Sequence, residues 1–164
     1  MERHFDDELK ELRKDVLKMS DLARNAISRS IEALKNRDKV QAQKVIDNDG
    51  NIDELELVID EKCIDLIALY QPMATDLRFI TTGMKLNAEI ERIADLAVDI
   101  AQRVLELADK PLVKPLIDIP RLSDVAQNMV REAIDSFIEK DVSLANKVMA
   151  SDEDADGLRN KICA

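Results

Sequence analysis

Apolar residues recur at steps of three and four over long stretches of the chain, and this spacing predicts amphipathic α-helices. The first predicted helix covers about 5–35, the second about 39–70 and the third about 75–108. The segment Asn48-Asp49-Gly50 should bend the second helix, because its residues favour turns. Three long helices joined by short connections predict an antiparallel up-down-up bundle.

The segment 110–120 contains three of the four prolines and is predicted to be a linker, since it cannot be helical throughout. A fourth helix should cover about 121–139, and Asp141 should cap a fifth that continues to the end. The predicted organisation is therefore a first three-helix bundle at 1–109, the linker at 110–120, and a partial second bundle at 121–164.

The second half of the chain repeats the first. When 20–55 is aligned with 123–158 at an offset of 103, 12 of 36 positions are identical without a gap. The matches include Asp38 with Asp141, Asp49 with Asp152, and Asp53 with Asp156. A duplicated bundle implies a sixth helix, for which the chain leaves no room. We interpret this sequence as a fragment, with a protein that lost its last helix as the alternative.

Composition supports an all-α fold with well over 70% helix. Hydrophobic residues make up 46% and charged residues 35%, whereas the chain has only three glycines, four prolines, three phenylalanines and one tyrosine. A β protein would need more turn residues and usually more aromatic residues. The interior must instead consist of aliphatic side chains and methionine.

The charge and the ends of the chain bear on function. A net charge of −10 disfavours nucleic acid and anionic lipid as partners, and favours cations or basic surfaces of proteins. No signal peptide and no 18-residue apolar run are present, so no membrane insertion is expected. Cys63 and Cys163 are isolated, which is typical of reduced cysteines in a cytoplasmic protein.

Acidic residues spaced four apart form the one candidate for a chemical site. Glu91, Asp95 and Asp99 share a stripe of the third helix, and Asp49 with Asp53 begins the long part of the second. Across a hairpin centred near Pro72, Asp49 is level with Asp95, and Asp53 with Glu91.

If the stripes face each other, four carboxylates converge, and a cation would relieve their repulsion. An all-oxygen set suits magnesium, calcium, manganese or iron better than structural zinc. Two solvated acidic faces at one level are the alternative. Asp152 and Asp156 repeat one pair in the second half.

Catalytic machinery is not evident. His4 is the only histidine and lies near the N-terminus, so histidine-based triads and Glu-x-x-His di-iron sites are excluded. No glycine-rich phosphate loop is present. A metal-dependent enzyme acting on phosphate esters would lack a nucleophile or base beyond its own metal ligands, and a metal-free structural scaffold is the other alternative.

The string Ile67-Ala68-Leu69-Tyr70-Gln71-Pro72-Met73-Ala74-Thr75-Asp76-Leu77-Arg78, with the segment 91–95 and the Asp49/Asp53 pair, resembles the PhoU family of phosphate-uptake regulators. The resemblance covers essentially the whole chain. It implies two similar three-helix bundles and negative regulation of phosphate uptake and of the phosphate response. Partners would be the ATPase of the phosphate ABC transporter and its sensor histidine kinase, at the cytoplasmic face of the membrane.

The resemblance also implies bound metal, often as a multinuclear cluster; iron, magnesium, manganese, calcium and zinc are the candidates. The first site would fall on Asp49, Asp53, Glu91 and Asp95, with Asp99 at its edge. Asp152 and Asp156 would form half of a second.

A further expectation concerns association. Without a sixth helix, apolar residues of the last two helices would lose cover, which favours a homodimer or a poorly ordered end. These residues are Val125, Met129, Ala133, Phe137, Val148 and Leu158.

Overall fold

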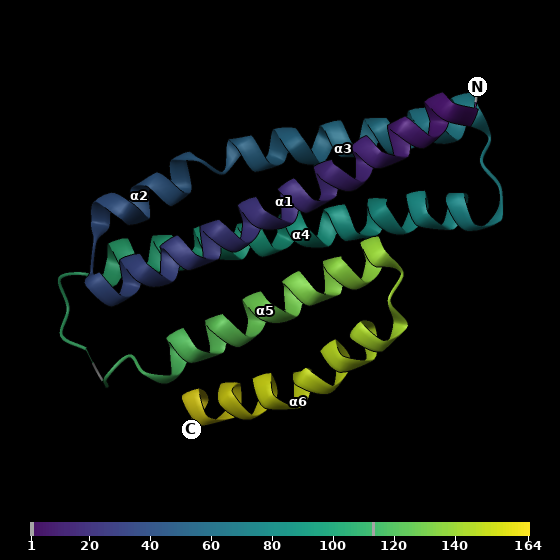
Figure 1. The fold of residues 1–164 in the computed structure, drawn as a ribbon. Coiled ribbons are helices and arrows are strands. Elements are labelled where there is room, and N and C mark those ends of the chain that lie inside the picture. Colours follow the sequence, from purple (N-terminus) through teal and green to yellow (C-terminus); the bar gives the residue numbers. More distant parts are fainter. Residues whose placement is uncertain (1, 113) are drawn as a thin grey trace.

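A computed structural model describes residues 2–112 and 114–164, and these residues are almost entirely helical (Figure 1). The helices are α1 (Glu2–Asn36), α2 (Lys39–Asp47), α3 (Gly50–Tyr70), α4 (Ala74–Leu107), α5 (Asp118–Glu139) and α6 (Val142–Cys163). Helix accounts for 88% of the structure, and the described residues contain no strand. The predicted all-α class is confirmed.

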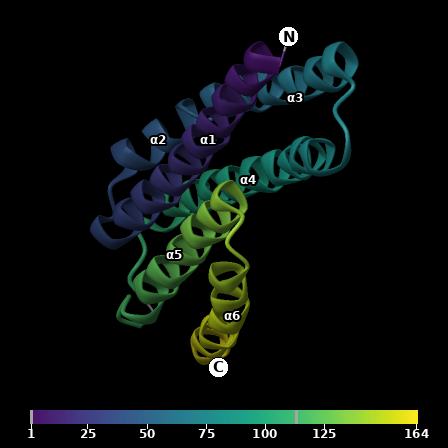
Figure 2. The same ribbon diagram turned by 45° about the vertical axis from the view of Figure 1, so that its right-hand side comes forward.

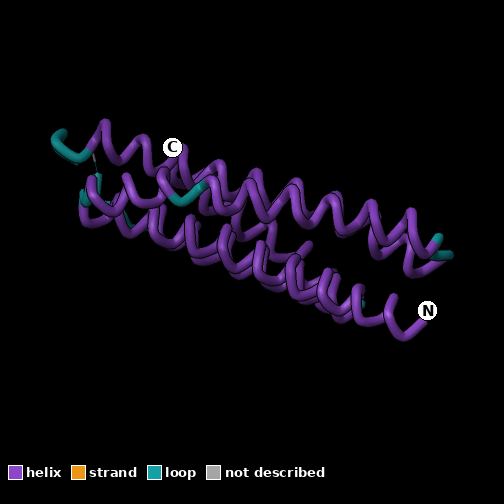
Figure 3. Tube along the Cα trace, turned by 90° about the horizontal axis from the view of Figure 1, so that it is seen from above, coloured by secondary structure: helices purple, strands orange, loops and turns teal. Residues whose placement is uncertain are grey.

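The first bundle consists of α1, the α2–α3 pair and α4, running alternately up and down. Seen along a second direction, the helices form long, nearly parallel rods (Figure 3). The main core of this bundle contains large side chains that are at most 2% exposed, among them Leu12, Met19, Ile59, Ile80 and Ile90. Burying such side chains is the main driving force for the fold.

A second core cluster lies where α2 packs on α1 and α4. It is built largely from small residues: Ala33, Ala42, Ala97 and Ala101, with Val45 and Val104. Small side chains let helix backbones approach closely.

The predicted bend of the second helix is confirmed, because α2 ends at Asp47 and α3 begins at Gly50. The Asn48 amide still donates to the Lys44 carbonyl at 3.2 Å, and the Asp49 amide donates to Ile46 at 3.3 Å. Short-range bonds of this kind tighten the last turn of a helix. The break leaves Asp49 half-buried at the start of α3.

The internal repeat is visible in the two helix connections. Arg37 and Lys140 both adopt the left-handed conformation, with φ of 57° and 56°. Asp38 and Asp141 follow them, and each side chain accepts a hydrogen bond at 3.0 Å from the amide three residues on. The same end-and-start geometry occurs twice because the same residue pattern occurs twice.

The second half lies beside the first. α5 packs on α6 and on α1, on the side of the bundle away from α3 (Figures 1 and 2). Ile134 is only 3% exposed and belongs to the main core. The chain is helical up to Cys163, and the order of this end stays a prediction. The six residues expected to lose cover, Val125, Met129, Ala133, Phe137, Val148 and Leu158, are half-buried.

The start of α5 differs from the prediction, because the helix begins at Asp118, inside the segment predicted as a linker. Pro120 lies in its first turn. A proline is compatible with that position, since the first amides of a helix have no intrahelical partner. Across the described residues, none of the helices has the length and apolar character required to cross a bilayer.

Candidate functional site

The acidic residues of α3 and α4 meet at the level that the sequence predicts. Partial burial raises the pKa of the Asp49 carboxyl, and the nearby charges of Asp53 and Asp95 raise it further. Asp49 lies at the start of α3 and Asp95 lies on α4. The effect of the Asp95 charge on Asp49 indicates that the two residues are close, as the predicted hairpin register requires.

Glu91 of α4 is a second carboxyl group in this region whose pKa is raised. Partial burial raises its pKa, and the charge of Asp95, one turn further along α4, raises it further. Weaker contributions come from Glu56 and Asp53 of α3. Each raised pKa means that the carboxylate is less favourable here than in water.

Two further acidic residues of α3 belong to this group and were not predicted from the sequence. Glu56 and Asp60 continue the series begun by Asp49 and Asp53 at steps of four, three and four. Partial burial, Asp60 and Asp53 raise the pKa of Glu56, in that order of importance. The regular spacing of Glu56 and Asp60 after Asp53 is the sequence signal that could have identified them.

Asn87 of α4 links α4 to α3 beside these carboxylates. Its side chain is fully buried, and its amide nitrogen donates to the Glu56 carbonyl oxygen at 2.9 Å and to the Asp60 carboxylate at 3.1 Å. The Asn87 amide oxygen is buried without a hydrogen-bond partner among the described residues. These bonds fix the register of α3 against α4 beside the carboxylates.

The carboxylates share a face without forming a coordination shell. Within 2–112 and 114–164, no group of three or more histidine, cysteine, aspartate or glutamate side chains is arranged to hold a metal ion. Like charges that face each other repel, which favours side-chain conformations that spread apart. Convergence of the four predicted ligands on one cation therefore stays a prediction.

The remaining predicted ligands lie apart from this group or at its edge. Asp99 is exposed on α4, one turn beyond Asp95. Asp152 and Asp156 are exposed on α6, which packs on α5. Asp156 forms an ion pair with Arg159 at 3.0 Å. The structure does not bring the α6 pair to the carboxylates of α3 and α4.

A hollow of about 200 Å³ opens beside Asp49, where α2 passes into α3. Side chains of mixed polarity line it, including Asn25, Arg29, Asn48 and Asn51. The hollow gives solvent and small solutes access to the partly buried carboxyl.

The two cysteines differ sharply. Cys63 is fully buried, and burial raises the pKa of its thiol to about 12. A thiol in this state is neither a metal ligand nor a nucleophile at neutral pH. Cys163 is exposed on α6.

Comparison with known proteins covers almost the whole chain. The PhoU domain model matches residues 16–104 and 119–163. The phosphate-specific transport system accessory protein PhoU homolog of Aquifex aeolicus is 40% identical over 155 residues, which is 94% of this chain and 70% of that protein. Homolog 1 from Thermotoga maritima is 34% identical over 97% of this chain and 69% of its own length.

Solved structures agree. The crystal structure of PhoU from Pseudomonas aeruginosa matches with a TM-score of 0.90 and 32% identity, over 96% of this chain and 76% of that one. The phosphate transport system regulatory protein PhoU from Streptococcus pneumoniae matches with a TM-score of 0.86 and 28% identity, over 94% and 72%. The PhoU domain model matches both repeats, and the solved PhoU structure shares the helical arrangement of this chain. The chain therefore belongs to the PhoU family.

Proposed function

We propose that this chain is an accessory protein of phosphate transport that lowers phosphate uptake and the phosphate-starvation response through contacts with other proteins. The family match over both repeats carries this proposal. In it, the ATPase of the phosphate ABC transporter and the associated sensor kinase are the partners, and the protein works at the cytoplasmic face of the membrane. The chain catalyses no reaction in this scheme.

The second part of the proposal is a metal ion at the carboxylates of α3 and α4. Asp49, Asp53, Glu91 and Asp95 would hold it, with Asp99 at the edge. The raised pKa values of Asp49 and Glu91 support this, because a cation would stabilise the ionised forms. An all-oxygen donor set fits magnesium, manganese, calcium or iron, and zinc less well. Asp152 and Asp156 would supply half of a second site.

The regulatory role is tested in a bacterium whose own accessory gene has been deleted. Such cells would express the chain or an empty vector, with phosphate uptake and a phosphate-starvation reporter as readouts. Lower reporter activity in phosphate-rich medium supports the proposal. If the folded, expressed chain leaves both readouts at the level of the empty vector, the proposed role is wrong.

The metal is tested by elemental analysis of the purified chain and by titration with Mn²⁺, Mg²⁺ and Fe²⁺. The variant Glu91→Gln/Asp95→Asn should lose the bound metal and keep its helicity. Glu153→Gln/Asp154→Asn on α6 is the matched control, because it removes the same charge from an exposed helix. Equal metal content in all three proteins would refute the assignment.

A further inference from the structure

Large apolar side chains project into solvent from the side of α3 that faces away from the bundle. Leu57, Val58, Ile64 and Leu69 are between 50% and 73% exposed. The buried side of the helix carries Ile52, Ile59, Cys63 and Leu66. Because α3 is apolar on two sides, only one side is explained by packing within this chain.

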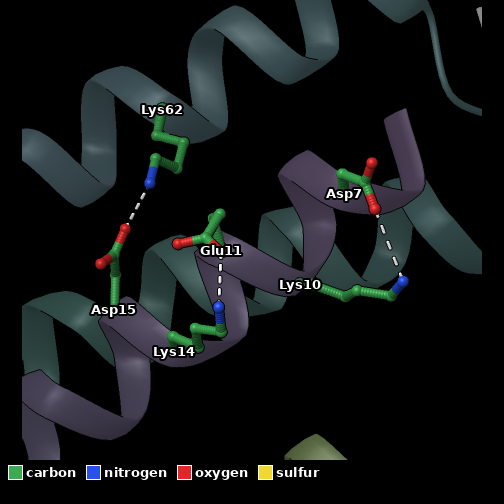
Figure 4. Close-up of polar contacts among 6 residues, drawn as sticks. All are labelled: Asp7, Lys10, Glu11, Lys14, Asp15 and Lys62. Atoms are coloured by element: carbon green, nitrogen blue, oxygen red, sulfur yellow. Dashed lines mark hydrogen bonds and ion pairs between the residues drawn. The ribbon is translucent and has the colours of Figure 1, made fainter. Parts of the chain in front are cut away.

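Acidic residues accompany these apolar ones. α3 contains the acids Asp53, Glu54, Glu56, Asp60, Glu61 and Asp65, against the single base Lys62. The ammonium group of Lys62 pairs with Asp15 of α1 (Figure 4), so Lys62 does not neutralise the negative charge on the outer side of α3. We name the set Leu57, Val58, Glu61, Ile64, Asp65 and Leu69 the α3 outer face.

A groove runs along one edge of this face. It has a volume of about 310 Å³ and lies between the beginning of α1 and α3. Val58 and Leu69 give it apolar walls, and Glu8, Glu61 and Asp65 give it three carboxylates, which outnumber the one lysine of its lining, Lys62; His4, Leu66 and Tyr70 complete the lining. This combination suits a lysine or arginine side chain, whose aliphatic part packs on apolar surface while its charged end meets acids.

The geometry points to a helix of a partner protein, amphipathic and rich in lysine or arginine, as the occupant of the α3 outer face. Leu57 and Ile64 are seven residues apart and therefore share one line along the helix, as in helix–helix contacts. The acids require a basic partner. A second copy of this chain is disfavoured, since two such faces would repel each other.

Among the residues that the structure describes, the other helices lie away from this face. α3 packs on α1 and α4, whereas α5 and α6 lie on the other side of the bundle (Figures 1 and 2). The inference rests on the proposed function, in which the chain acts through protein contacts. It adds to that proposal the surface used and the chemistry of the partner's segment.

The binding test uses three labelled helical peptides and the whole chain. The first has a leucine face and an arginine face, the second has glutamate in place of arginine, and the third has the first peptide's composition in scrambled order. Fluorescence anisotropy in physiological salt should show binding of the first peptide only. Binding of the scrambled peptide with equal affinity would mean nonspecific charge attraction and would overturn the inference.

Variants locate the contact. Leu57→Ser/Ile64→Ser and Glu61→Gln/Asp65→Asn should each weaken binding of the first peptide about fivefold or more, because central contacts carry most of the affinity. Val40→Ser/Ile117→Ser and Glu153→Gln/Asp154→Asn are the controls, at exposed positions outside α3, and should bind as the unchanged chain does. Equal weakening by the control variants would place the contact elsewhere and refute the inference.

The same variants separate this inference from the proposed function. In cells lacking the accessory gene, the unchanged chain should restore phosphate regulation and both α3 variants should fail, at equal expression. If all variants restore regulation, the function stands and the α3 outer face is wrong. If the unchanged chain restores nothing, the function fails, and the peptide measurements still decide whether the face binds basic helices.

Discussion

The ring of Phe79 on α4 stacks on the ring of Phe137 on α5, with centroids 4.5 Å apart and planes inclined by only 3°. The guanidinium of Arg13 on α1 lies 4.9 Å from the centroid of the Phe79 ring. Three helices from the two halves of the chain therefore meet at one aromatic contact. This contact fixes where the second half sits against the first bundle.

Replacing Phe137 with alanine should lower the free energy of unfolding by about 1–3 kcal/mol, since the change removes a half-buried ring and its stacking contact with Phe79. Urea denaturation measures the loss. Phe137→Leu keeps much of the apolar area and should cost clearly less. An unchanged midpoint for Phe137→Ala would mean that the ring pair does not hold α5 in place.

The carboxylates should make stability depend on pH. The folded pKa values of Asp49 and Glu91 lie above the usual 3.8 and 4.5, so folding favours their protonated forms. Their ionisation therefore lowers stability at pH 7, and this cost disappears as the pH falls through the raised values toward the usual ones. Asp49→Asn/Glu91→Gln should be more stable than the unchanged chain at pH 7, by less than about 1 kcal/mol, and equally stable near pH 4.

Bound metal should make the unchanged chain more stable than the Asp49→Asn/Glu91→Gln variant at pH 7. Excess Mn²⁺ should raise the melting temperature of the unchanged chain, because a ligand that binds only the folded state stabilises it. The Asn/Gln variant should not respond. Thermal unfolding with and without the ion, with chelator as the control, measures both effects. A similar shift in both proteins would place the ion elsewhere.

The two aspartate caps should contribute equally to stability. Asp38→Ala and Asp141→Ala each remove a 3.0 Å hydrogen bond to a first-turn amide, and each should cost about 1 kcal/mol. Asparagine at either position keeps an acceptor and should cost much less. Urea denaturation of the four variants compares them, and a cost at only one position would show that the repeated geometry is not matched in energy.

The two thiols should react at very different rates. Cys163 is exposed, whereas Cys63 is buried with its pKa raised to about 12, so iodoacetamide at pH 8 should modify Cys163 alone in the folded chain. Mass spectrometry of the digested protein measures the modification at each site. In urea both should react, and rapid modification of Cys63 without urea would reveal frequent opening of the core.

A homodimer also stays a prediction. Val142 and Met149 are 72% and 74% exposed on α6, and burying such side chains between two chains favours association. Light scattering over a range of protein concentrations measures the mass. Val142→Ser/Met149→Ser should shift the equilibrium toward monomer, and a monomer at all concentrations for the unchanged chain would contradict the prediction.

Local patterns were enough to predict the helices and the level of the acidic residues. Apolar spacing marks the helical faces, and turn residues mark the breaks at 48–50 and 71–73, because both effects act within a few residues of the chain. Equal distance from the turn then placed Asp49 level with Asp95. The predicted cap of Asp141 is confirmed, and Asp38, its counterpart in the repeat, caps α2 with the same geometry.

Other features were decided only by tertiary packing. The sequence could not show that Ile134 enters the first core, that Phe137 stacks on Phe79, or that Asn87 binds the backbone of α3 beside Glu56, because these contacts join residues far apart in the chain. The sequence also could not show which apolar residues of α3 are exposed to solvent. Periodicity identifies apolar positions, but only the arrangement of neighbouring helices decides that Ile59 is buried and Ile64 faces solvent.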